Sequence, residues 1–129
     1  MRFYQVHQTF TIQSSWDGDD LCGIVVVSSD QLWECTCKLN APVGMDSTTF
    51  IDLLKHAFLN DTAGMKINKS GNDLLIDCNH SSDGFTFTFA SFKLEQAAGT
   101  NVLSFYQKAI MDLLKENIVK RVMQSNIKL

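Results

Sequence analysis

The side chains able to carry out chemistry are scattered along this 129-residue sequence and form no catalytic pattern. The three histidines, His7, His56 and His80, fall in segments predicted as a strand, a helix and a turn, and no HExxH spacing relates any of them. The sequence also lacks the GxSxG nucleophile elbow and the Walker phosphate-binding loop. These spacings give no support to an enzyme, although a site that assembles only in the folded chain would leave no such motif. We expect no metal and no cofactor.

The four cysteines show neither the CxxC spacing of a zinc site nor the framework of a small disulfide-bonded domain. Cys22, Cys35, Cys37 and Cys78 all fall in segments that are typical of strands. Cys35 and Cys37 place two thiols on one strand face, but no further ligand lies nearby in the sequence. We expect free thiols in the core of a protein from a reducing compartment.

The charged residues indicate solvated surfaces. A net charge of -3 argues against strong, general binding to nucleic acid. Asp17, Asp19 and Asp20 surround Gly18 in a predicted turn, with a spacing that does not fit a calcium loop. The basic residues near the end of the sequence form either a solvated helix face or a weak DNA-contacting stripe; they are Lys115, Lys120, Arg121 and Lys128.

The elements that must position these residues are mostly strands. Alternating apolar and polar residues predict six of them, the first running unbroken from Arg2 to Gln13. A helix over residues 46–59 follows the third strand, with Asp46 or Ser47 as its cap and an apolar face of Phe50, Leu53, Leu54, Ala57 and Phe58. We expect an antiparallel β-sandwich or open barrel closed by helices. The apolar runs are too short to span a membrane, and we expect no signal peptide.

Phe92 and Leu94 break the alternation set by Phe85, Phe87 and Phe89. One strand phase cannot bury both sets on the same side. Either a β-bulge resets the register, or Phe92 lies on the outer face. An outer Phe92 is then covered by the helix over residues 46–59 or left for a partner.

Residues 100–129 are predicted to form one long helix that begins at a Thr100 cap. At ~1.5 Å per residue it exceeds about 40 Å, whereas a globule of roughly 100 residues has a radius of gyration of about 13 Å. The helix either folds back on the domain or overruns it and pairs with another chain. Its apolar stripe has helical spacing: Leu103, Tyr106, Ile110, Leu114, Ile118, Val122 and Leu129.

Several motifs in order resemble the head domain of a family of DNA end-joining scaffolds, the X-ray repair cross-complementing protein four, XLF and PAXX. Residues 90–95, which read Ala-Ser-Phe-Lys-Leu-Glu, resemble the Gly-Ser-Phe-Asn-Leu-Glu segment that leads into the family's stalk. Ser15-Trp16-Asp17 resembles its Ser-Trp-Glu, Trp33 falls at a family Trp, and residues 50–59 look like its internal helix. The likeness spans nearly the whole chain and is closest to the cross-complementing protein.

The resemblance implies a seven-stranded antiparallel β-sandwich head over residues 1–99, with an inserted helix. It also implies a coiled-coil stalk that begins over residues 100–129 and forms a parallel homodimer, here through Leu114, Ile118, Val122 and Leu129. The implied function is a non-enzymatic nuclear scaffold in non-homologous end joining. Such a scaffold bridges DNA ends and holds DNA ligase IV through its stalk. It joins an XLF-like head through positions that match Lys55, His56 and Phe92. We expect the ring of Phe92 to be partly exposed beside Lys55 and His56, where it forms an apolar spot rimmed by basic groups.

The sequence also departs from this family. The link between Lys38 and Asp46 is short, so part of the family's helix-turn-helix is missing, and the ligase-binding stalk is expected beyond Leu129. We therefore expect a truncated head. Two alternatives stay open, namely the centriolar spindle-assembly scaffold, whose head is similar, and a β-barrel that binds a small ligand. A lined cavity of several hundred Å³ would favour the barrel.

Overall fold

The computed structural model describes residues 1–97 and 102–127, with side chains placed as far as Glu116. The chain divides into two compact units, Met1–Ala98 and Gly99–Leu129. The first unit contains the sheet and its helical connection, and the second contains one long helix. Thr100, the predicted cap, lies outside the described residues, as do Lys128 and Leu129.

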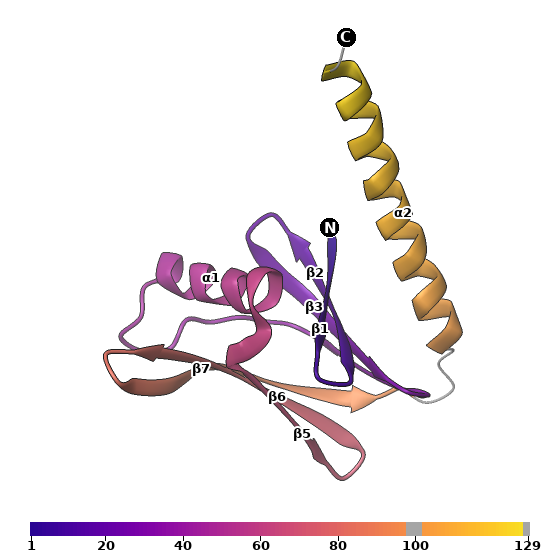
Figure 1. Cartoon of the computed structure of the whole chain (residues 1–129). Helices are drawn as coiled ribbons and strands as arrows, with labels where there is room; N and C mark the ends of the chain where they lie inside the picture. Colours follow the sequence, from indigo (N-terminus) through magenta and orange to yellow (C-terminus); the bar gives the residue numbers. More distant parts are fainter. Residues whose placement is uncertain (98–101, 128–129) are drawn as a thin grey trace. The chain divides into compact units, whose positions relative to one another are not determined.

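The first unit is one curled sheet of seven antiparallel strands (Figure 1). In sheet order the strands are β1-β2-β3-β4-β7-β6-β5, so β1 and β5 form its outer edges. The mainly-β antiparallel prediction is confirmed. The strands are β1 (Arg2–His7), β2 (Phe10–Asp17), β3 (Asp20–Ser28), β4 (Gln31–Thr36), β5 (Met65–Ser70), β6 (Asp73–Ser82) and β7 (Phe85–Gln96).

The prediction of one strand from Arg2 to Gln13 is wrong, because the chain reverses at Gln8 and Thr9. Gln8 has a φ of 56°, and His7 pairs with Phe10 across the resulting hairpin. The left-handed conformation is uncommon for residues other than Gly, Asn and Asp. No glycine or proline marks this turn, so the alternation of apolar residues runs through it in the sequence.

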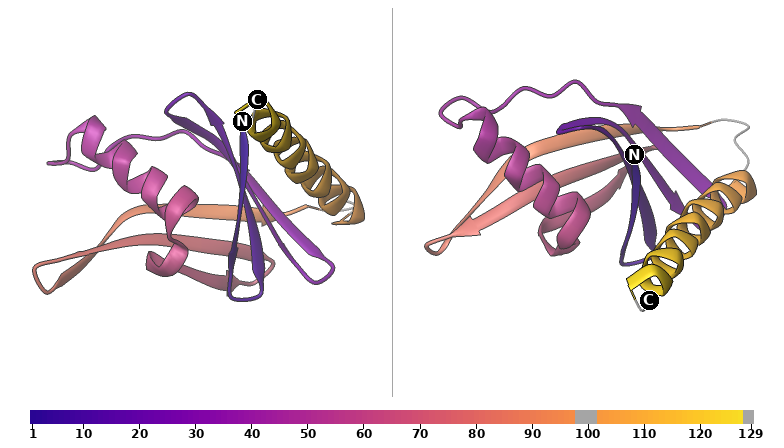
Figure 2. Two further views of the ribbon diagram at one scale, coloured as in Figure 1. Left: turned by 45° about the horizontal axis from the view of Figure 1, so that its top comes forward. Right: turned by 90° about the horizontal axis from the view of Figure 1, so that it is seen from above.

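The predicted helix over residues 46–59 is present, but its final turn is wider than an α-helix. It consists of α1 (Ser47–Lys55) and a π-helical turn, η1 (His56–Asn60), followed by a short 3₁₀ turn, η2 (Thr62–Gly64). The backbone N–H of Thr49 donates to Asp46 Oδ1 at 2.7 Å, so Asp46 is the cap. The two views of Figure 2 show α1 lying across the concave side of the sheet.

The helical connection also ties the outer edge of β1 to the start of β5. Gln5 Nε2 donates to the carbonyl of Leu59 at 2.8 Å, and His7 Nδ1 lies 3.3 Å from Thr62 Oγ1. The 3₁₀ turn η2 then leads directly into β5, the opposite edge strand. The two edges of the curled sheet are therefore linked through the segment that follows α1.

A β-bulge in β7 explains the irregular phenylalanine pattern. Cys78 pairs with Ala90, whereas Asn79 pairs with Thr88, so Phe89 is the extra residue on β7. The bulge places Phe89, Phe92 and Leu94 in the core together. Phe92 is only 9% exposed, so the expectation of a partly exposed ring is wrong. The bulge alternative is the one that the structure bears out.

The second unit contains α2 (Val102–Ile127), which is continuous over its 26 residues. Three residues of the predicted apolar stripe are exposed, namely Leu103, Ile110 and Leu114. None of the helices in the described ranges has the length and apolar character needed to cross a membrane.

Candidate protein-interaction site

Lys55 and His56 lie next to each other where α1 passes into η1, but Phe92 does not join them at the surface. Lys55 Nζ forms an ion pair with Asp19 Oδ1, which lies between β2 and β3. His56 is exposed. The ring of Phe92 lies beneath the helical segment, against Phe58. The predicted apolar spot rimmed by basic groups is therefore not formed by this set.

The residues expected to mediate dimerisation and DNA contact fall on α2, and only part of them is described. Leu114 is 51% exposed, and the neighbouring Lys115 is also exposed. Ile118, Val122, Lys120 and Arg121 belong to the helical backbone, but their side chains lie outside the described part. The roles assigned to these residues stay predictions.

A feature that the sequence did not reveal is a split in the sheet between β4 and β7. These strands share only two residue pairs in the described structure, Trp33 with Gln96 and Glu34 with Glu95. Beyond Glu34, β4 continues to pair with β3, and β7 continues to pair with β6. The two facing strand edges therefore diverge, and we call the space between them the split.

The closed end of the split is held by contacts around Trp33. The N–H of Ala97 donates to the carbonyl of Leu32 at 2.9 Å. The indole Nε1 of Trp33 donates to the carbonyl of Asn72 at 3.0 Å. Lys69 Nζ lies 5.4 Å from the centre of the Trp33 ring, at cation–π distance. These contacts join β4 to β7 and to the β5–β6 turn, so the split opens from this end.

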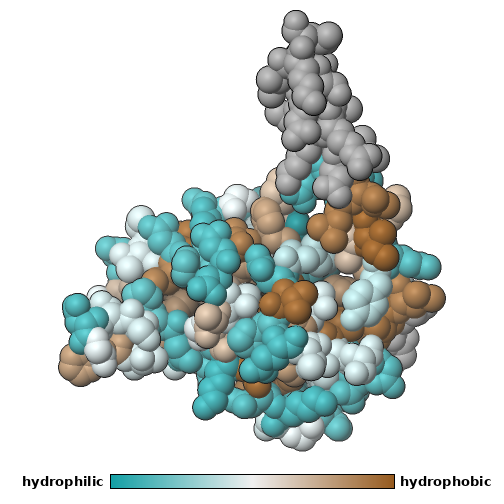
Figure 3. Space-filling view, viewed as in Figure 1, coloured by the Kyte–Doolittle hydropathy of each residue, from teal (hydrophilic) through white to brown (hydrophobic). Residues whose placement is uncertain are grey.

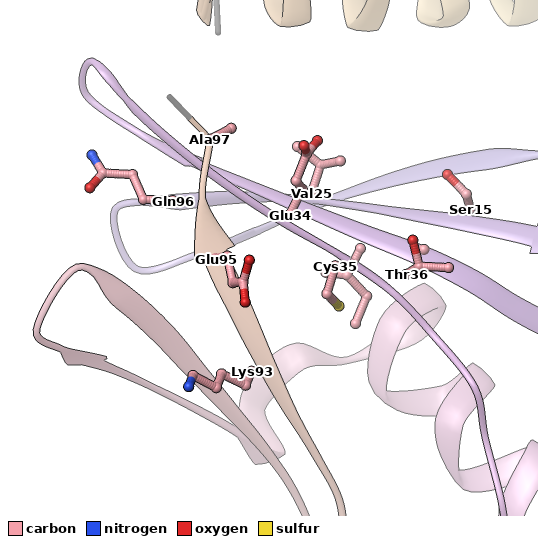
Figure 4. A pocket seen from close by; sticks show the side chains of 11 residues that line it. Ser15, Val25, Glu34, Cys35, Thr36, Lys93, Glu95, Gln96 and Ala97 are labelled. Atoms are coloured by element: carbon pink, nitrogen blue, oxygen red, sulfur yellow. The ribbon is translucent and has the colours of Figure 1, made fainter. Parts of the chain in front are cut away.

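Two clefts occupy the split. The larger, of about 590 Å³, extends from the split past β3 to Ser15 of β2. Its lining in the split includes Glu34, Cys35 and Thr36 from β4 and Lys93 and Glu95 from β7. Figure 4 shows these side chains on the two diverging strands, with the opening between them. The smaller, of about 390 Å³, lies between residues 35–40 and residues 89–93. Cys35, Thr36 and Lys93 line both clefts, which makes them one continuous opening.

The ladder geometry tells which backbone groups face the split. In an antiparallel ladder, alternate residues turn their N–H and C=O groups towards the same neighbouring strand. Ala97 bonds towards β4, so Lys93 and Ser91, at even spacings from it, also face the β4 side. Cys37 bonds back to Cys22 on β3, so Thr36, the last residue of β4, faces the β7 side. Both edges therefore present backbone donors and acceptors to the split.

The smaller cleft is apolar on its inner side and cationic at its mouth. Phe50 of α1 and Phe89 and Phe92 of β7 contribute apolar side chains. Lys38 and Lys93 are its charged lining residues, and Lys93 also lies 3.4 Å from Asp73.

The cysteines are unbridged thiols that differ in burial. Cys78 is buried, and this burial raises its pKa to about 12. Cys35 Sγ and Cys37 Sγ lie 3.9 Å apart; their hydrogen bond lowers the pKa of Cys35 and raises that of Cys37. Cys22 is exposed, so the expectation that every cysteine belongs to the core is wrong for this residue.

A third cleft of about 380 Å³ lies between the helical connection and β6, with His56 and His80 among its lining residues. In the ranges that the structure describes, no three His, Cys, Asp or Glu side chains are grouped to hold a metal ion. The concave side of the sheet is filled by the apolar face of α1 and η1. The three clefts thus lie beside the core. Their volumes reach the several hundred Å³ that would favour a barrel that binds a small ligand, so this alternative stays a prediction.

Comparison with known proteins found no matching protein-family model and no matching curated protein.

Proposed function

We propose that this chain is the head and the first stalk segment of a non-enzymatic dimeric scaffold that acts in DNA double-strand break repair by non-homologous end joining. The observation that carries the proposal is the order of its elements. Four strands precede an inserted helix, three strands follow, and the motif over residues 90–95 lies on β7, the last strand before α2. The resemblance implies seven antiparallel strands, an inserted helix and a long terminal helix, and the elements of this chain are compatible with that set.

The proposed homodimer forms through parallel copies of α2 that begin a coiled coil. Leu103, Ile110 and Leu114 are exposed apolar side chains at spacings of seven and four, the seam spacing of paired helices. In the sequence, Ile118, Val122 and Leu129 continue this stripe. A second copy of the chain would remove the stripe from water, which is the main source of free energy in such assemblies.

The proposed contact with an XLF-like head uses the surface around Lys55 and His56. Because Phe92 is buried against Phe58, its role in this contact is to hold the helical segment in place from below. DNA ligase IV would bind a stalk beyond this chain. Any direct contact with DNA would be weak and would come from Lys115, Lys120, Arg121 and Lys128. The proposed location is the nucleus.

Sedimentation velocity over a concentration series tests the dimer. We expect reversible dimerisation that Leu114→Glu weakens by at least tenfold, roughly 1.4 kcal/mol. Lys108→Glu, on the opposite side of α2, is the matched control because it also introduces a carboxylate. A chain that stays monomeric at millimolar concentration contradicts the proposal.

Binding to an XLF-like head separates end joining from the centriolar alternative. Titration calorimetry with a purified XLF head is expected to show binding that Lys55→Glu weakens. Lys66→Glu, on β5, is the control with the same change of charge. Dimerisation with no affinity for an XLF head favours the centriolar scaffold.

A further inference from the structure

The split leaves two strand edges without a ladder partner in the described part of the head. Thr36 turns its backbone groups into the opening from one side, and Ser91 and Lys93 do so from the other. The outer edge of β1 differs in that the segment after α1 contacts it, through the hydrogen bond from Gln5 to Leu59. An unpaired strand edge is a template for another extended chain. The split combines such an edge on β7 with a cleft beside it that can hold a further chain.

We propose that the split binds an extended peptide segment of a partner protein, which adds to the free edge of β7 as an antiparallel strand. Main-chain hydrogen bonds provide affinity in this mode of recognition, and alternate side chains provide specificity. The segment occupies the place that β4 would fill if its pairing with β7 continued beyond Glu34. This proposal does not depend on the end-joining function.

The side chains that line the split indicate which peptide fits. Directly opposite residues of an antiparallel pair point to the same face. Peptide residues opposite Phe92 and Leu94, which face the core, are therefore apolar. Residues opposite Ser91 and Lys93, which face outwards, are acidic where they lie along the smaller cleft, because its charged lining residues are Lys38 and Lys93. Glu34 and Glu95 line the larger cleft, so no acidic residue is expected at the end of the peptide that lies beside them. The preferred segment thus alternates apolar and acidic residues.

The same charges argue against a second copy of this chain as the occupant. Pairing of two copies along the smaller cleft would bring Lys38 and Lys93 of both copies together, whereas Glu34 and Glu95 line only the larger cleft. Like charges at neighbouring positions of a ladder are destabilising. A partner peptide with carboxylates at these positions is attracted instead.

The test uses the fluorescein-labelled peptide Val-Glu-Val-Glu-Val and the full chain in a fluorescence anisotropy titration. In the proposed register the glutamates lie opposite Ser91 and Lys93, so the glutamate N–H groups bond to β7. N-methylation of the glutamates is therefore expected to weaken binding by at least about tenfold. N-methylation of the valines leaves binding within about twofold, because their N–H groups face away from β7. Both comparisons change only the peptide and leave the protein unaltered.

Two pairs of protein variants complete the test. Ser91→Pro removes an N–H that faces the split, and Ser91→Ala is its control because both variants lose the Ser91–Asp77 hydrogen bond. Lys38→Glu is expected to weaken binding, whereas Lys66→Glu is not. No saturable binding at millimolar peptide, or equal losses for the two N-methylated peptides, overturns the proposal. Self-association that Ser91→Pro abolishes, without peptide binding, also overturns it in favour of a second copy.

Discussion

The ring of Phe92 meets the ring of Phe58 edge-on, with their centroids 5.9 Å apart and their planes at 75°. This pair joins β7 to η1 and so fixes the helical connection on the sheet. Because both rings are buried, we expect Phe92→Ala to lower the free energy of unfolding by about 3–5 kcal/mol. Urea denaturation of the full chain measures this loss.

Phe85→Ala is the matched control for this prediction. Phe85 lies on the same strand but is 77% exposed, near the free end of the β6–β7 hairpin, where Figure 3 shows hydrophilic, neutral and weakly apolar side chains side by side. We expect its truncation to change the free energy of unfolding by less than about 0.5 kcal/mol. Similar small losses at both positions would mean that Phe92 is not a core residue.

The cap at Asp46 predicts an acid-sensitive contribution to stability. The Thr49 N–H that donates to the Asp46 carboxylate holds the pKa of this group below its usual range. The contribution is therefore present above the unfolded pKa, about 4, and is lost as pH falls through the lower folded pKa. The melting temperature of the wild type should exceed that of Asp46→Ala at pH 7, and this difference should disappear at acidic pH. The difference in melting temperature between Asp46→Asn and Asp46→Ala should persist at acidic pH, because asparagine caps a helix without titrating.

Thiol reactivity should follow the burial of each cysteine. We expect alkylation of the native chain with iodoacetamide to modify exposed Cys22 and, with its lowered pKa, Cys35 well before Cys78. Cys78 should react only after unfolding, since it is buried and its pKa is raised to about 12. Peptide mass spectrometry at successive times measures the order. Modification of all four thiols at one rate would contradict the assignment of Cys78 to the core.

Gly64 marks a close approach between η2 and β6. A Cβ atom at this position would lie 2.5 Å from the carbonyl oxygen of Asn79, so the backbone would have to move. We expect Gly64→Ala to destabilise the chain by about 1–3 kcal/mol in thermal or urea unfolding. Gly23→Ala is the control, because its Cβ would meet the Cys35 carbonyl at an ordinary 3.5 Å. A neutral Gly64→Ala would show that η2 shifts freely.

Sequence patterns predicted the strands and the inserted helix because each depends on local periodicity. The Asp46 cap and the hairpin between β3 and β4 follow from a few adjacent residues. The turn at Gln8 was missed, since its left-handed conformation carries no glycine to mark it. The phase change before Phe92 did show that a bulge or an outer Phe was required, but the choice between them depends on pairing with β6.

No pattern in the sequence indicated the split between β4 and β7 or the Lys55–Asp19 ion pair. Whether β4 stays paired with β7 depends on the curl of the whole sheet and on contacts such as Trp33 with Asn72. Asp19 and Lys55 lie far apart in the sequence, and each alone is an ordinary surface charge. Long-range relationships of this kind are set by the folded arrangement and leave no periodic trace in the residues.

The short pairing between β4 and β7, which we call the seam, also has a consequence for how the chain folds. β1 to β4 form by successive hairpins, and so do β5 to β7, whereas the seam joins residues far apart in the sequence. Loop-closure entropy makes such distant contacts slow to form. The two hairpin groups should therefore acquire structure first, and their joining should limit the rate. In the native state, separation of β4 from β7 should be the local unfolding event with the lowest free energy. The amides of Glu34 and Glu95 should therefore exchange with solvent sooner than those at the centres of the two hairpin groups.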